Sequence, residues 1–194
     1  MVNEMLEIDK SFPSNYRCKV IEEMPNAAFE RYYFPEGGKE GGRDGVLVSI
    51  TPVDGNEWIG VFGSVQKYPK SLSKILSWPD DNKICVVSSG AAVIVDVNNP
   101  LNFELVGVEP IFHAIPIQES GIVVFADFTS LIAYNEKGIV WKSKRVSWDG
   151  LEIISVDQSC INGSYWDIKS ESKTPFKVNI ATGEVEGGVG ESAF

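Results

Sequence analysis

Residues Lys83–Val106 read KICVVSSGAAVIVDVNNPLNFELV, in which two apolar runs of strand length flank the turn Ser88-Ser89-Gly90. Small and turn-forming residues between β-branched runs are typical of antiparallel strands joined by tight turns. The same order of strand, turn, strand, turn and strand returns in Ile122–Lys142 and Cys160–Glu186. A unit of several short strands that recurs about every 40 residues is typical of the blades of a β-propeller.

We therefore predict an all-β fold of propeller-like antiparallel sheets with few helices. Closed propellers carry about four or more blades, so three units predict a partial or irregular propeller of short blades. A distorted two-sheet sandwich is the alternative arrangement of the same units. Strand patterns at residues 16–21, 46–50 and 58–62 indicate a further, degenerate blade, and only Gln66–Lys74 has some helical character. The chain of 194 residues fits a single all-β domain. In it, residues 1–45 form an N-terminal segment with a glycine-rich loop, and residues 46–194 hold the β-repeat units.

The net charge of the chain limits the kinds of partner that we expect it to bind. Asp and Glu number 27 and Lys and Arg 17, which leaves a net charge of −10. Such an excess repels phosphates, so we expect no direct binding to nucleic acid, and it attracts basic proteins. No apolar run reaches the roughly 20 residues of a membrane span. Three distant cysteines and an N-terminus without a signal-peptide layout favour the cytoplasm.

The residue types and motifs that perform catalysis are scarce in this sequence. The single histidine, His113, lies between apolar residues, and the chain has neither a G-x-S-x-G elbow nor a metal-ligand spacing to accompany it. The loop Pro35–Gly45 (PEGGKEGGRDG) combines glycines with cations but lacks the Gly-Lys-Ser/Thr sequence of a phosphate-binding loop. We therefore predict no enzyme, no cofactor and no metal, and interpret His113 as a strand residue.

Short motifs along most of the chain resemble one family of small bacterial β-repeat proteins. They are SITPVDG at 49–55, WIGVFG at 58–63, FADF at 125–128, GIVWKS at 138–143, VSWDGL at 146–151, ING at 161–163, FKV at 176–178 and TGE at 182–184, followed by Gly187-Gly188. The resemblance implies no catalytic residues. It also implies an association with immunity proteins of contact-dependent growth inhibition, which neutralise a cognate toxin, often a nuclease, by binding and covering it.

Charge and resemblance together favour a cytoplasmic, non-enzymatic immunity protein whose partner is a basic toxin domain. Acidic side chains would meet the face with which that toxin holds phosphates. The candidate partner-binding residues are acidic or aromatic residues of predicted loops: Glu36, Glu40, Asp44, Asp80, Asp81, Glu109, Glu119, Trp148 and Asp149. Two alternatives stay open. One is a structural or housekeeping interaction module of the propeller type. The other is a carbohydrate-active enzyme, with carboxylates gathered around His113 or Arg145.

Overall fold

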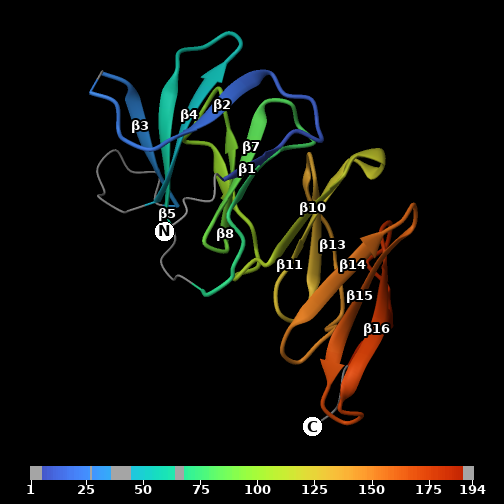
Figure 1. Cartoon of the computed structure of the whole chain (residues 1–194). Coiled ribbons are helices and arrows are strands. Elements are labelled where there is room, and N and C mark those ends of the chain that lie inside the picture. Colours follow the sequence, from blue (N-terminus) through green and yellow to red (C-terminus); the bar gives the residue numbers. More distant parts are fainter. Residues whose placement is uncertain (1–5, 27, 36–44, 64–67, 190–194) are drawn as a thin grey trace. The chain divides into compact units, whose positions relative to one another are not determined.

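The computed structural model describes residues 6–26, 28–35, 45–63 and 68–189, which form seventeen β-strands and one short 3-10 helix (Figure 1). The strands make four small sheets, and no α-helix occurs among these residues. The all-β class and the organisation into short propeller-like sheets are therefore confirmed. In the described ranges, no helix has the length and apolar character needed to span a membrane.

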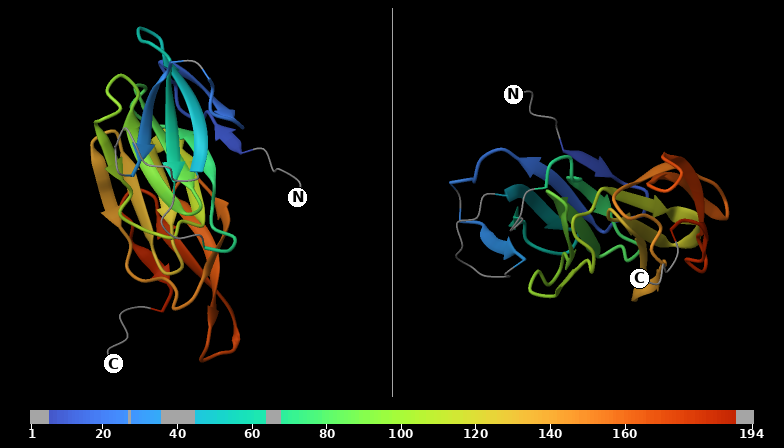
Figure 2. Two further views of the ribbon diagram at one scale, coloured as in Figure 1. Left: turned by 90° about the vertical axis from the view of Figure 1, so that its left-hand side faces the viewer. Right: turned by 90° about the horizontal axis from the view of Figure 1, so that it is seen from below.

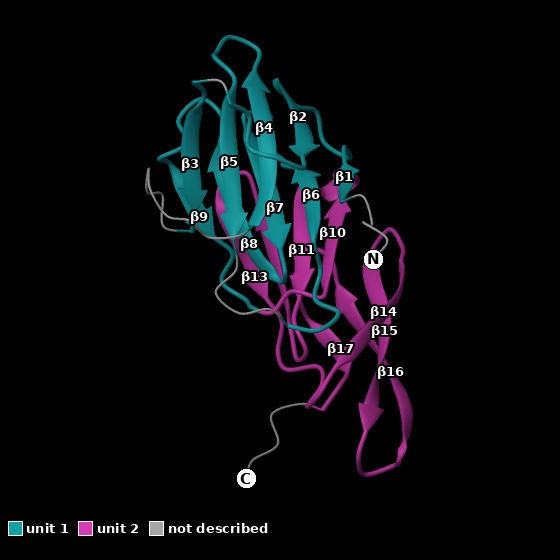
Figure 3. Cartoon of the chain, turned by 60° about the vertical axis from the view of Figure 1, so that its left-hand side comes forward, with its two compact units in different colours: residues 1–109 teal, residues 110–194 magenta. Residues whose placement is uncertain are grey.

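The chain divides into two compact units, residues 1–109 and 110–194 (Figure 3). Each unit contains two sheets that share a hydrophobic core. That both units belong to one domain over residues 1–194 stays a prediction.

The first unit contains a five-stranded and a four-stranded sheet. The five-stranded sheet has the order β1 (Glu7–Asp9), β6 (Lys74–Ser77), β7 (Lys83–Ser88), β8 (Ala91–Asp96) and β9 (Phe103–Leu105). The four-stranded sheet has the order β2 (Tyr16–Ile21), β4 (Gly45–Pro52), β5 (Trp58–Gly63) and β3 (Glu30–Phe34). Strands β1 and β3 pair parallel with β6 and β5, so the two sheets of this unit are mixed. The reason is that both are edge strands from the N-terminal segment that no hairpin joins to their neighbours.

The second unit consists of two four-stranded antiparallel meanders. One has β10 (His113–Ile117), β11 (Ile122–Ala126), β12 (Leu131–Asn135) and β13 (Gly138–Lys142), with the 3-10 helix η1 (Gln118–Ser120) between β10 and β11. The other has β14 (Leu151–Val156), β15 (Cys160–Asp167), β16 (Ser172–Asn179) and β17 (Val185–Gly187). The hairpin of β15 and β16 is the longest, and its tip pairs only with itself between Trp166 and Lys173 (Figures 1 and 2).

The threefold repeat in the sequence corresponds to three of these sheets. Each repeat supplies the second, third and fourth strands of a meander: β7–β9, β11–β13 and β15–β17. The first strand of each meander comes from the connecting segment before the repeat. Sequence analysis missed β6, because the end of the supposed helical stretch Gln66–Lys74 is the start of that strand, and residues 68–73 are irregular.

Alternation of side chains along the strands builds a core between the two sheets of each unit. The core of the first unit combines residues of both sheets: Val48, Ile50, Trp58 and Phe62 from one, and Ile84, Val86, Val93 and Val95 from the other. The core of the second unit has Val124, Leu131, Ala133 and Trp141 from one sheet, and Ile161, Tyr165, Phe176 and Val178 from the other. Two sheets packed face to face through apolar side chains are how neighbouring blades bury their surfaces.

One backbone hydrogen bond closes an end of every sheet. A carbonyl shortly before one strand accepts the N–H of a residue that follows the neighbouring strand. The four pairs are Val53 to Asn15 (2.9 Å), Val97 to Asn82 (2.9 Å), Val146 to Thr129 (2.7 Å) and Ile180 to Ser159 (2.8 Å). In three sheets an aspartate two residues before the acceptor caps the turn, because Asp80, Asp127 and Asp157 each accept the N–H of residue i+2. These bonds from Ser159, with others from Asn162 and Cys160, lower the pKa of Asp157 to about 2.

A buried tryptophan joins the two sheets of each unit at this end. The Trp58 indole N–H donates to the carbonyl of Val97 at 2.9 Å, and that of Trp141 donates to Ile180 at 2.8 Å. Both pairs span 39 residues. The two tryptophans lie at positions that differ by 83 in the printed sequence, as do the two acceptors. Their cross-strand neighbours, Ile50 and Ala133, keep the same offset. The two units therefore share the same arrangement of core tryptophan, backbone acceptor and cross-strand neighbour. We call this shared arrangement the internal frame.

We predict that Trp141→Phe lowers the free energy of unfolding by about 1–3 kcal/mol, because it removes the indole donor and leaves the Ile180 carbonyl unsatisfied in a buried place. Urea denaturation measures this change. Trp166→Phe is the matched control, since Trp166 is 53% exposed at the hairpin tip. Equal effects of the two substitutions would contradict the role of the indole hydrogen bond.

Candidate protein-binding surface

The structure describes six of the nine residues expected to contact a partner. Glu36, Glu40 and Asp44 lie outside the described residues. Of the other six, five fall in loops and Glu119 lies in the short 3-10 helix that precedes β11. Three belong to each unit.

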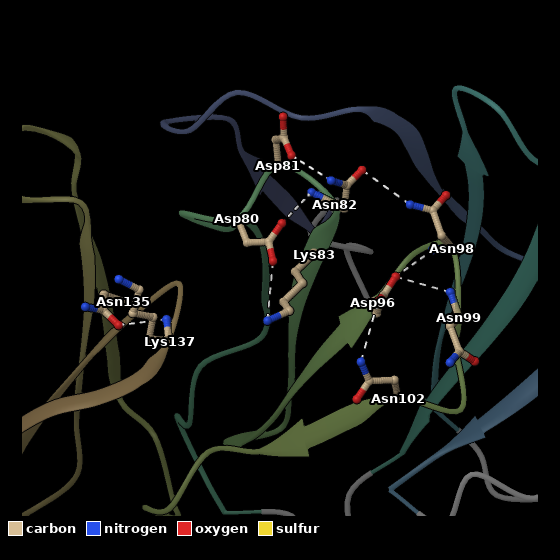
Figure 4. Close-up of polar contacts among 10 residues, drawn as sticks. All are labelled: Asp80, Asp81, Asn82, Lys83, Asp96, Asn98, Asn99, Asn102, Asn135 and Lys137. Carbon is tan, nitrogen blue, oxygen red and sulfur yellow. Dashed lines mark hydrogen bonds and ion pairs between the residues drawn. The ribbon is translucent and has the colours of Figure 1, made fainter.

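Asp80 and Asp81 lie in the turn between β6 and β7, where their carboxylates hold the turn together (Figure 4). Asp80 accepts the N–H of Asn82 at 3.0 Å and pairs with Lys83 at 3.4 Å. Asp81 accepts the side-chain amides of Asn15 and Asn82, both at 2.8 Å. These two carboxylates stabilise the local structure, so any contact with a partner would be additional to that role.

Glu109 and Glu119 are exposed but isolated from the other candidates of their own units. Glu109 lies in the segment after β9, away from the β6–β7 turn along the chain. Glu119 lies in η1, at the start of β11, whereas the loop with Trp148 bonds to Phe128 at the end of that strand. A strand of this length separates the two places by about 17 Å. Glu119 and Trp148 therefore belong to different ends of the sheet.

The loop between β13 and β14 carries Trp148 and Asp149 and is held firmly in place. Val146 and Ser147 both donate their N–H to the carbonyl of Thr129, and Gly150 donates to Phe128 at 3.0 Å. The Ser147 hydroxyl donates to the carbonyl of Gly150 at 2.6 Å. Val146 and Ser147 are fully buried. The side chains at the top of the loop are therefore presented from a fixed backbone.

Aromatic and cationic side chains lie together where this loop bonds to the end of β11. The guanidinium of Arg145 lies 4.9 Å from the centre of the Trp148 ring, a cation–π contact. The rings of Phe112 and Phe128 lie 4.2 Å apart, and Phe128 is 39% exposed. Asp149 beside them is exposed. We call Phe112, Phe128, Arg145, Trp148 and Asp149 the Trp148 surface.

Its composition is that of a protein-binding hot spot. Tryptophan, arginine and other aromatic residues are enriched where binding energy is concentrated, with polar residues around them. The sequence pattern predicted Trp148 and Asp149 as candidate partner-binding residues, and the structure places Arg145, Phe112 and Phe128 beside them. The available signal was the Asp-x-Thr turn at Asp127, which brings Phe128 beside the later loop.

His113, at the start of β10, is half-buried, and its side chain hydrogen-bonds to the backbone of Leu151 in the neighbouring sheet. Burial lowers the pKa of His113, while the bond to Leu151 and the charge of Glu152 oppose that shift. This arrangement fits the interpretation of His113 as a strand residue that links the two sheets. Among the described residues, no group of three or more His, Cys, Asp or Glu side chains is arranged to hold a metal ion.

Comparison with protein-family models gives no match for this chain, and comparison with curated proteins gives none either. The structure itself defines the class of the protein: it is an all-β protein of small propeller-like sheets, with the Trp148 surface at the loop between β13 and β14.

We predict that Asp127→Ala lowers the free energy of unfolding by about 1–2 kcal/mol, because the Asp127 carboxylate accepts the N–H groups of Thr129 at 2.6 Å and Ser130 at 2.8 Å. Chemical denaturation checks this. Asp149→Ala is the control, since no described residue donates a hydrogen bond to that carboxylate and the side chain is exposed. If both variants are as stable as the native chain, the Asp127 turn does not fix the surface.

We also predict that stability falls as the pH drops below about 6.5, the ordinary pKa of histidine. The folded state favours neutral His113, so its contribution is fully present above the unfolded pKa and is lost as pH falls through the lower folded pKa. Thermal denaturation between pH 7.5 and 5.5 measures this slope. The chain has one histidine, so His113→Gln should flatten the slope, and an unchanged slope in that variant would contradict the assignment.

Proposed function

We propose that this chain is a non-enzymatic binding protein, most concretely an immunity protein that neutralises a basic, nuclease-type toxin domain by covering it. The observation that supports binding is the Trp148 surface, in which stacked Arg145 and Trp148 lie on a loop held by backbone hydrogen bonds. Side chains fixed in advance lose little conformational entropy when a partner binds, which favours affinity.

The net charge of −10 supports the choice of a basic partner. Complementary charge raises the rate of encounter and disfavours nucleic acid as a competing ligand. Exposed Asp149 adjoins the aromatic residues, so a basic side chain of the partner would meet it at the rim of the contact. The three cysteines carry free thiols, which supports the reducing cytoplasm as the compartment.

The interaction-module alternative uses the same surface and differs only in the partner. The discriminating experiment is co-expression with a basic, nuclease-type toxin domain, for which the product of the neighbouring gene is the first candidate to test. Immunity predicts restored growth and a one-to-one complex on size-exclusion chromatography. Growth arrest that the chain fails to relieve, without complex formation, would remove the immunity proposal and leave a module with another partner.

For the complex with that toxin, we predict that Trp148→Ala weakens affinity at least about tenfold, because a central aromatic anchor contributes roughly 2 kcal/mol or more. Asp149→Asn should mainly slow association and reduce its dependence on salt. Surface plasmon resonance measures both. Trp166→Ala is the matched control, an exposed tryptophan at the β15–β16 tip. If Trp148→Ala binds as tightly as the native chain, the partner contacts another surface.

A further inference from the structure

The second unit contains a concave site that the proposed partner binding does not use. It lies where the end of β13 meets β16 and the turn to β17, and it has a volume of about 610 Å³. Lys142, Lys144 and Lys177 line it, together with Asn179 and Thr182. We call it the lysine cavity. Its volume falls within the range of small-molecule sites, about 300–1,000 Å³.

The lysines of this cavity differ from most others in the protein. Elsewhere lysines pair with carboxylates, as Lys74 does with Glu7 and Asp9, and Lys173 with Glu152. Across the described ranges, no ion pair is formed by Lys142, Lys144 or Lys177, although Glu184 and Glu186 also line the cavity. Residues 110–194 carry eleven acidic and seven basic side chains, so three of those seven are gathered here. The lining holds three lysines and two glutamates, so it has an excess of one positive charge within an acidic unit, and this excess would attract an anionic ligand.

The first unit shows which side chains the internal frame has at the positions of the three lysines. With the offset of 83 that relates Trp58 to Trp141, the three lysines correspond to Ile59, Val61 and Ile94 of the first unit. All three of those residues are buried apolar side chains. The same frame therefore has hydrophobic residues at these positions in one unit and ammonium groups around a cavity in the other. The backbone does not require lysine there.

The floor of the cavity is rigid. Asn179 Oδ1 accepts the N–H groups of Ala181 at 2.9 Å and Thr182 at 3.0 Å, and Gly183 donates to the carbonyl of Asn179 at 2.8 Å. Gly183 has a φ of +72° and packs on Trp141, where a Cβ would lie 2.6 Å from the ring. The Trp141 indole in turn bonds to Ile180. The turn is therefore fixed from both sides before any ligand binds.

The polar residues that line the cavity supply mainly donor groups. They comprise three ammonium groups, the Asn179 amide nitrogen and the Thr182 hydroxyl, whereas Glu184 and Glu186 supply carboxylates at the same site. Charge-assisted bonds from several lysines suit a phosphate group, whose oxygens accept in several directions. We infer that the lysine cavity binds the phosphate groups of a small molecule, either a free polyphosphate or a nucleotide.

The experiment measures thermal unfolding of the full chain with pyrophosphate, and separately with a nucleoside diphosphate, at constant ionic strength. A ligand that binds only the folded state raises Tm with its concentration. We expect Tm to rise on adding pyrophosphate. A larger rise with the nucleotide at equal concentration indicates that the base is also bound, and an equal rise indicates a site for phosphate alone. Isothermal titration calorimetry gives the dissociation constants.

Lys144→Gln and Lys177→Gln should each weaken binding about tenfold, since each removes one charge-assisted contact. Lys169→Gln is the matched control, a lysine in the β15–β16 turn that does not line the cavity. Far-ultraviolet circular dichroism confirms that the variants are folded. Absence of a Tm shift at millimolar pyrophosphate, or an equal shift in all three variants, would overturn the proposal.

Discussion

A buried indole N–H requires a hydrogen-bond acceptor. In each unit of this protein the acceptor is the backbone carbonyl at the equivalent position. Trp58 and Trp141 each lie in the core between two sheets and donate to the backbone carbonyl that ends a strand of the opposite sheet. The N–H of that same acceptor residue closes its own sheet. One residue thus connects the hydrogen bonding of a sheet to the packing of two sheets. Loss of the bond would leave an unsatisfied polar group where water is excluded.

Sequence pattern was sufficient for the fold class, because most strands alternate or run apolar and end in recognisable turns. Strand β2 has the limits expected from the sequence, and β7, β11 and β15 begin at the first residues of the three repeat units. Strand β6 was missed, since its four residues follow an irregular stretch and carry no alternating signal. The parallel partners of β1 and β3 were also missed, because pairing between distant segments leaves no mark in the local pattern.

The candidate site was predictable only in part, and for a related reason. Trp148 and Asp149 stood out because they lie in a turn-rich sequence where a tryptophan is unusual. Phe112 and Phe128 stood out less, since each resembles a core residue in its own strand-like context. What gathers them with Arg145 is a set of backbone hydrogen bonds between loops that are separate in sequence. Asp80 and Asp81 are also predicted to face a partner, and their oxygens already accept hydrogen bonds from Asn82 in the same turn and from Asn15 before β2.

The 83-residue offset between the two units has a consequence for how this protein can change. Bonds of the main chain and the side chains of the core between the two sheets keep the architecture, so positions on the other face of a strand can acquire new chemistry independently in each half. Ile59 and Lys142 illustrate this freedom, for one is buried and apolar while its counterpart is charged and exposed. A chain built in this way is a natural scaffold for directed evolution, in which one half can be diversified while the other preserves a reference copy of the same frame.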